Sequence, residues 1–426
     1  MTQSNLLPAI SRLREAYGLW HEAAKNYGSP DEFRTYLNAC IQALRNVTFV
    51  LQKQKSGIDN FEEWYSQWQA ALKADKIMAW CVTARNCIVK QGDLETRSIA
   101  LAAYVASYLE APKHEFEVDP FVDTAEIAKK IVSKHLPKYL HQEGYLKVER
   151  RWIDKGLPEY ELLEVLSYAF SVLTQLVMDV QTRQGPKFSK QKENIEEAFS
   201  KSASAIQIDK SVIPYCMSSH ADWRTVWVKL PSMQIMQYVV KDRAGELVSK
   251  EKILKKYGLA SPSETKEQSE LLKQALYFLE QAKRMLTVDK HLITAVFLIS
   301  ADKKLTILPL EFEDHDQKYV MWDIVASELE RRDANAIIVI GEAWVAEFDP
   351  QNPTRRPEDA SERKEAIKVN ALAKDGENFA ITVPFTRKWR KIRFQDEIYH
   401  DDKYTANFLD PIRRVWGLSR NRTSRA

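Results

Sequence analysis

The chain has 426 residues, enough for two or three domains, and its hydrophobic fraction of 45% is normal for a globular protein. Its 62 Lys and Arg residues against 59 Asp and Glu leave a formal net charge of +3. A net charge this small does not favour binding to nucleic acid or to an anionic membrane surface. The four Cys residues form no Cys-x-x-Cys pair and no Cys/His ligand spacing. We therefore expect no metal and no cofactor, and the scattered thiols are typical of a cytoplasmic protein.

The first predicted region is an antiparallel helical bundle over residues 1–110, with residues 6–108 helical. A capping pattern at Ser29-Pro30-Asp31-Glu32 begins a helix whose apolar stripe continues to Leu51. A second capping pattern begins at Asn60, and a further helix covers about Asp75–Lys90 before Gly92 ends it. Short connections between helices favour antiparallel neighbours.

The middle of the chain is predicted to be mixed. Residues 111–184 are expected to be a helical extension that contains a strongly apolar helix, although no apolar run is read as a membrane span of about 18 residues. Residues 185–215 are polar and rich in Lys, Ser and Gln, as in a linker or mobile loop. Residues 216–288 are predicted to be a hairpin plus helices, because 224–230 alternates and a Pro-Ser turn follows.

The last region, residues 289–417, is predicted to be a small α/β domain, and residues 418–426 a basic tail. Its elements follow the order β-β-α-β-β-β, with the helix at Lys318–Arg332, which places one main helix against an antiparallel sheet. The chain as a whole is therefore predicted to be an α+β protein. It has an N-terminal antiparallel helical bundle, a mixed middle region and a C-terminal antiparallel sheet with one main helix.

A polar cluster interrupts the apolar side of the predicted helix at Asp75–Lys90. Arg85 falls on the side that carries Met78 and Cys81, and a buried arginine is costly unless it is paired. Asn86 and Lys90 are four residues apart and share a helical side. This pattern suggests either a site or an internal partner for Arg85, and ordinary helix-end chemistry also explains Lys90.

Three further residues are candidates for binding. Arg45 and Asn46 form a second Arg-Asn pair on the helix that begins at Ser29. They either face Arg85 across the bundle or lie on a solvated edge. Asp93, three residues beyond Lys90, is the third candidate.

Residues 6–108 resemble the HEPN superfamily through this cluster and the number of helices. HEPN domains are four- or five-helix bundles, many of them metal-independent ribonucleases of prokaryotic toxin and antiviral systems. Their motif is an Arg, a polar residue, and a His four to six positions after the Arg. Arg85 matches the Arg and Asn86 the polar residue, whereas Lys90 stands where the His should be. The resemblance implies that these three residues would be the catalytic ones.

The lysine changes what the resemblance implies. A Lys is normally cationic and acts as a base only when strongly desolvated, whereas as a cation it binds a phosphate. The first hypothesis is therefore a non-catalytic binding or regulatory protein with a degenerate phosphate- or RNA-binding site, in a prokaryotic defence or toxin–antitoxin context. A metal-independent endoribonuclease and a structural scaffold are the alternatives. The expected partners are RNA or a nucleotide, a protein or a second copy of the chain, and no membrane.

Overall fold

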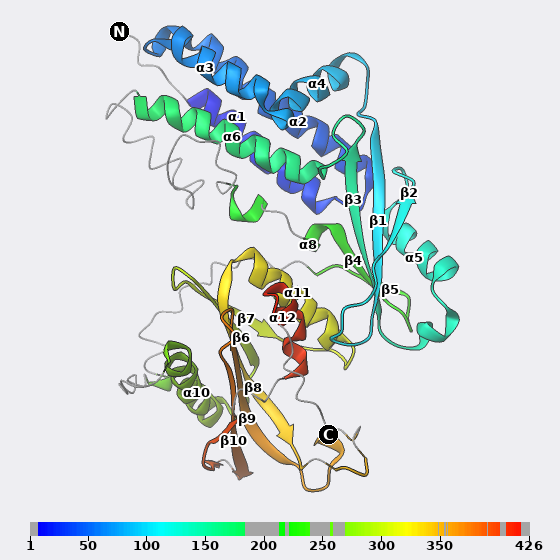
Figure 1. The fold of residues 1–426 in the computed structure, drawn as a ribbon, viewed down its shortest axis with the longest axis vertical. Coiled ribbons are helices and arrows are strands. Elements are labelled where there is room, and N and C mark those ends of the chain that lie inside the picture. Colours follow the sequence, from blue (N-terminus) through cyan, green and yellow to red (C-terminus); the bar gives the residue numbers. More distant parts are fainter. Residues whose placement is uncertain are drawn as a thin grey trace. The chain divides into compact units, whose positions relative to one another are not determined.

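The computed structural model describes residues 7–183, 213–217, 221–238, 256–258, 269–347, 349–352, 355, 357–389, 391–400 and 406–418. The chain forms two compact units (Figure 1). Unit 1 comprises residues 1–104 and 111–239, and unit 2 comprises residues 105–110 and 240–426. Helices and antiparallel sheets occur in both, so the α+β class is confirmed. The finer division at residues 184, 215 and 288 stays a prediction.

Five long helices build the main core of unit 1. They are α1 (Leu7–Lys25), α2 (Pro30–Lys53), α3 (Phe61–Ala74), α4 (Lys76–Lys90) and α6 (Leu162–Arg183), with the short 3-10 turn η1 (Lys55–Gly57) after α2. The predicted starts are close to those observed, since Pro30 is the first residue of α2 and Asn60 precedes α3. Asp75 caps α4 by accepting a hydrogen bond from the backbone N–H of Met78 at 2.8 Å.

A five-stranded sheet completes unit 1, in the order β2-β1-β3-β4-β5. Its strands are β1 (Thr96–Val105), β2 (His114–Val118), β3 (Tyr145–Asp154), β4 (Thr225–Lys229) and β5 (Gln234–Met236). The helix α5 (Thr124–His135) packs against it through Ile127, Ile131 and Val132. The short elements of this unit are η2 (Lys138–Gln142), η5 (Tyr215–Met217) and α8 (Ala221–Arg224).

Two parts of the predicted bundle are corrected. Residues 96–105 form strand β1 and not a helix, because Ser98, Ala100 and Ala102 are buried with the period of two that a strand requires. The bundle also extends beyond residue 110, since Trp152 and α6 belong to the same core as α1–α4. Residues 185–212, the greater part of the predicted linker, lie outside the described residues.

Helix α6 is long and apolar enough to cross a membrane by length and composition, contrary to the prediction that no run of that kind exists. In its most apolar stretch, however, 83% of the residues are buried inside the protein. The neighbours that bury it are the other helices of the core. The apolar character of α6 is therefore accounted for by its place at the centre of unit 1.

Unit 2 is built on a seven-stranded antiparallel sheet. Its path is β11-β10-β9-β8-β6-β7, with β12 paired to β10. The strands are β6 (Thr294–Ser300), β7 (Leu305–Leu310), β8 (Ala334–Val345), β9 (Lys364–Ala373), β10 (Asn378–Lys388), β11 (Lys391–Phe394) and β12 (Ile398–His400). The predicted order β-β-α-β-β-β is confirmed by β6, β7, α11 (Gln317–Arg331), β8, β9 and β10.

Helices cover both faces of this sheet (Figure 1). The helix α10 (Glu270–Asp289) packs on one face, where Leu279 and Leu286 contact alternate residues of β8 and β9. The helices α11 and α12 (Asp410–Val415) cover the other face. The short elements are η6 (Pro357–Asp359) and η7 (Asn407–Leu409). Residues 419–426 of the predicted basic tail lie outside the described residues.

Candidate functional site

Two arginines of unit 1 share one aromatic ring. Arg45 and Phe49 are one turn apart on α2, and Arg85 comes from α4. The guanidinium carbon of Arg45 lies 5.1 Å from the centre of the Phe49 ring, and that of Arg85 lies 5.8 Å from it. Both distances are in the range of cation–π attraction. Phe49 is 38% exposed, so its ring is accessible from solvent.

Neither arginine has a carboxylate partner among the described residues. Arg45 donates to the Thr48 hydroxyl at 3.4 Å, and its Nε atom is buried without a hydrogen-bond partner. Arg85 donates to the amide oxygen of Asn86 at 3.4 Å. Burial lowers the pKa of Arg45, Tyr65 and Cys81 oppose that shift, and the like charge of Arg85 makes a smaller contribution that lowers it. An anion placed between the two guanidinium groups would relieve this repulsion and satisfy their donors.

The helices around the pair supply apolar surface and positive charge. Val82 and Val89 flank Arg85 on α4 at helical spacing and are 38% and 51% exposed. Helix α4 contains no acidic residue, and α2 has none after Glu32. We call Arg45, Phe49, Arg85 and the two valines the Arg45–Arg85 surface. It combines cationic and apolar groups and lacks an acid from either helix.

The thiol beneath this surface is chemically quiet. Cys81 is buried on the inner side of α4. Burial raises the pKa of its thiol to about 12, although the charge of Arg45 opposes that shift. A thiol held in the protonated form is a poor nucleophile. The chemistry of the site is therefore confined to the exposed side chains.

Of the other predicted site residues, Asn86 joins the pair by accepting the hydrogen bond from Arg85. Asn86 and Lys90 are exposed, and Asn46 is partly buried. Asp93 is engaged elsewhere, because its carboxylate accepts hydrogen bonds from Arg34 at 2.5 Å and Asn38 at 2.8 Å. The structure thus brings Arg45 and Arg85 together and ties Asp93 to α2. Phe49 was not among the predicted residues, although its place off the apolar stripe of α2 was a signal.

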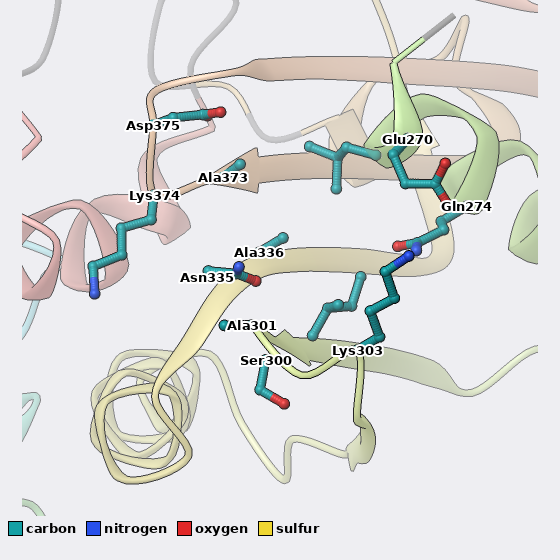
Figure 2. Close-up of a pocket in the computed structure, with 12 residues that line it drawn as sticks. Glu270, Gln274, Ser300, Ala301, Lys303, Asn335, Ala336, Ala373, Lys374 and Asp375 are labelled. Atoms are coloured by element: carbon teal, nitrogen blue, oxygen red, sulfur yellow. The ribbon is translucent and has the colours of Figure 1, made fainter. Parts of the chain in front are cut away.

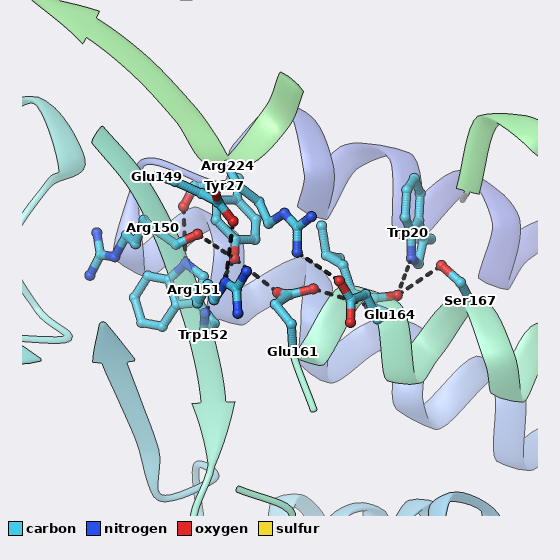
Figure 3. A network of polar contacts seen from close by, with 11 residues as sticks. Trp20, Tyr27, Glu149, Arg150, Arg151, Trp152, Glu161, Glu164, Ser167 and Arg224 are labelled. Atoms are coloured by element: carbon cyan, nitrogen blue, oxygen red, sulfur yellow. Dashed lines mark hydrogen bonds and ion pairs between the residues drawn. The ribbon is translucent and has the colours of Figure 1, made fainter. Parts of the chain in front are cut away.

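Among the described residues, the completely buried arginine is Arg150 on β3, and it serves the fold (Figure 3). It donates to the Ser98 hydroxyl at 2.7 Å and to the carbonyl oxygen of Val122 at 2.8 Å. Its guanidinium carbon lies 3.9 Å from the centre of the Trp152 ring. Burial lowers the pKa of Arg150 to about 10, although nearby acidic groups oppose the shift. These contacts join β1, β3 and the segment before α5.

A neighbouring network joins the start of α6 to α1 and α8 (Figure 3). The Tyr27 hydroxyl contacts the Glu161 carboxylate at 2.9 Å, and Arg224 pairs with Glu164 at 2.7 Å. Burial raises the pKa of Glu161, while the charge of Arg224 opposes that shift. These buried polar groups have partners within unit 1, so we assign them a structural role.

Unit 2 contains a cavity of about 580 Å³ at one end of its sheet (Figure 2). Its polar and charged lining includes Glu270, Gln274, Lys303, Asn335, Lys374 and Asp375. Lys303 lies near Gln274, while Lys374 and Asp375 stand on the opposite side. Positively charged lysines and negatively charged carboxylates line the same space. This mixture of charges favours no single class of ligand.

The sequence comparisons identify the family. The chain matches the family described as bacteriophage lambda protein ea47 over residues 3–425. The chain belongs to this family. It is 27% identical over 358 residues to "Protein ea47" of Escherichia phage lambda, an alignment that covers 79% of each chain. No solved structure shows significant similarity to it.

Membership of the ea47 family overturns the HEPN resemblance. The match extends over nearly the whole chain, and neither comparison indicates HEPN. The structure explains the error, since the helices belong to a core that also contains Trp152 and α6 from outside residues 6–108. RNA binding and a toxin–antitoxin or defence context rested on the resemblance and are withdrawn with it.

Proposed function

We propose that this protein is a non-catalytic binding protein of a bacteriophage that acts in the cytoplasm on a protein partner. The observation that carries the proposal is the pair of arginines over Phe49, neither of them balanced by a carboxylate in the described chain. Membership of a phage protein family supports the biological setting. The buried position of α6 is consistent with a protein that does not use this helix in a membrane.

The composition of the Arg45–Arg85 surface favours a protein as its ligand. Arginine and aromatic residues are enriched where proteins bind one another, usually with apolar contacts around them. Phe49, Val82 and Val89 offer such apolar contacts. The two guanidinium groups would pair with carboxylates, since each can hold one through two parallel hydrogen bonds. The partner is therefore expected to present acidic and apolar side chains together.

The same residues support binding more than catalysis. General acid–base chemistry needs a group that exchanges a proton near neutral pH. Arginine stays protonated there, and the only thiol described at this surface has a pKa of about 12. Both arginines can hold an anion, but neither can take a proton from a substrate. We therefore keep binding as the proposed activity.

The test compares proteins captured from phage-infected cells by the full chain and by two charge-reversal variants. Arg85→Glu changes the surface, and Lys73→Glu changes an exposed lysine on α3 as the matched control. A partner retained by wild type and Lys73→Glu should be lost with Arg85→Glu. The purified partner should then bind Arg85→Glu at least about tenfold more weakly, because hot-spot residues contribute about 2 kcal/mol or more. Equal binding to all three chains would refute the proposal, and capture abolished by nuclease would indicate a nucleic acid instead.

A further inference from the structure

Strand β7 ends the sheet of unit 2 and has β6 as its neighbour on one side. The hairpin between them closes with a hydrogen bond from Ser300 N–H to the Lys304 carbonyl at 3.1 Å. Lys303 adopts a left-handed conformation with φ of 61°, as in three-residue hairpin loops. Because hydrogen-bonded positions alternate along an antiparallel strand, residues 304, 306 and 308 face the backbone of β6. Leu305 and Ile307 therefore direct their backbone N–H and C=O groups outward.

The outward-facing part of β7 is also apolar. Leu305 is 46% exposed and Ile307 is 55% exposed, and both side chains lie on the face that carries Phe297. No charged residue occurs from Leu305 to Leu310. Natural proteins usually protect a sheet edge with charges, prolines or a covering element. Within β7 that protection is limited to Pro309, which stands at an outward position and has no N–H to donate.

The position of Pro309 selects one way of adding a strand. In an antiparallel arrangement of two β7 strands centred on Thr306, Leu305 of each copy lies opposite Ile307 of the other. Both residues then use their outward N–H and C=O groups, and Pro309 falls outside the pairing, opposite Lys303. The apolar side chains of Leu305 and Ile307 meet directly across the strands, where such pairs are favourable. The charges nearest the axis are the two Arg332 side chains, which donate to the Thr306 hydroxyls at 3.3 Å and are each paired with Glu328 at 3.0 Å.

We propose that two copies of this chain associate through β7, antiparallel about a twofold axis at Thr306, to form one continuous sheet. A second copy fits because the edge is uncharged and complementary to itself, as a twofold interface requires. A charged peptide would find no charge of opposite sign between Leu305 and Leu310. Backbone hydrogen bonds supply affinity in this mode, and the alternate side chains supply register.

The first test is the mass of the full chain by sedimentation equilibrium over a range of concentrations. Wild type should approach twice its mass of 49.3 kDa. Ile307→Lys should remain at 49.3 kDa, because the substitution places charges at the centre of the interface. Val288→Lys is the control, since Val288 is 45% exposed on α10 and lies outside β7. A wild type that stays monomeric, or an Ile307→Lys variant that still dimerises, would overturn the proposal.

The second test examines the register by disulfide formation. A residue on the twofold axis at a non-hydrogen-bonded position has its Cα atom about 4.5 Å from its counterpart, within the range that a disulfide can bridge. Thr306→Cys should therefore form a cross-linked dimer under mild oxidation. Lys304→Cys should not, because its counterpart lies four residues away along the partner strand. Cross-linking of Lys304→Cys at the same rate would contradict the proposed pairing.

Discussion

Arg45 and Arg85 come from different helices, and both guanidinium groups lie over the ring of Phe49. Burial is the main cause of the lowered pKa of Arg45, Tyr65 and Cys81 oppose it, and the like charge of Arg85 lowers the pKa further. Phe49 compensates part of this cost through its contacts with both guanidinium groups. The two guanidinium groups can therefore bind an anion, because the described part of the chain supplies no carboxylate to pair with them.

Removing Arg85 should cost little stability. The described hydrogen bond of Arg85 is to Asn86 at 3.4 Å. Removal of the Arg85 side chain also removes its repulsion with Arg45. We expect Arg85→Ala to change the free energy of unfolding by less than about 1 kcal/mol, as for most residues without a buried partner. Urea denaturation gives the value. A loss of about 3 kcal/mol or more would indicate a buried ion pair and contradict the unpaired state.

Removing Arg150 should be costly. Arg150→Ala would leave the Ser98 hydroxyl and the carbonyl oxygen of Val122 without their donor inside unit 1. Each buried polar group left unsatisfied costs about 1–3 kcal/mol, so the two together should cost about 2–6 kcal/mol. The control is Arg151→Ala, which removes an exposed pair with Glu149 and should cost about 1 kcal/mol or less. Equal denaturation midpoints for the two variants would disprove this assignment.

Asp179 should stabilise unit 1 by accepting two indole hydrogen bonds. Trp64 and Trp68 donate to the same carboxylate oxygen at 2.7 and 2.8 Å. Asp179→Leu would leave two buried N–H groups unpaired, at a cost of about 2–5 kcal/mol. Asp179→Asn keeps a hydrogen-bond acceptor, so it should lose less unfolding free energy than Asp179→Leu. Thermal unfolding followed by tryptophan fluorescence measures both, and the reverse order of the two variants would be inconsistent with the contact.

Unit 1 should lose stability as the pH falls below neutrality, in part through His21. Burial lowers the pKa of His21 below its ordinary value of 6.5, although Glu22 opposes the shift, and its Nε2 atom is buried without a partner. The unfolded chain then binds a proton near pH 6.5 before the folded chain does, so this contribution is present above that pH and is lost as the pH falls toward the folded pKa. Unfolding free energies at pH 7.5 and 5.5, values chosen to lie about one unit either side of 6.5, should differ less in His21→Gln than in wild type. An identical pH dependence in wild type and His21→Gln would show that His21 does not contribute to the loss of stability.

Much of the fold follows from periodicity that is local in sequence. The capping pattern at Ser29 and the apolar stripe after it predict α2, and the alternation in residues 289–417 predicts the order of strands along the chain on either side of α11. Strand β1 escaped prediction because its buried positions carry Ser98, Ala100 and Ala102, which are small residues without strong strand preference. Which helices share a core depends on contacts between distant segments, such as those of Trp152 with the bundle.

The candidate site was also only partly predictable, because it too depends on contacts between distant segments. The rule that a buried arginine needs partners applies to Arg150, which is completely buried, and not to Arg85, which is only partly buried. The sequence signal for Arg150 was its place between Val148 and Trp152 on the inward side of a strand. The approach of Arg45 to Arg85 depends on how α2 and α4 pack, and no spacing within either helix encodes it.

The most direct measurement of the central claim is photo-crosslinking from the Arg45–Arg85 surface during infection. Benzoylphenylalanine in place of Phe49 keeps an aromatic ring at the centre of the surface. The same group in place of Tyr139, which is 73% exposed elsewhere in unit 1, is the control. We expect Phe49→benzoylphenylalanine to give a covalent adduct with one acidic protein, and we expect Arg85→Glu in the same chain to abolish it. The same adducts from both positions, or an adduct that survives Arg85→Glu, would contradict the claim that this surface binds the partner.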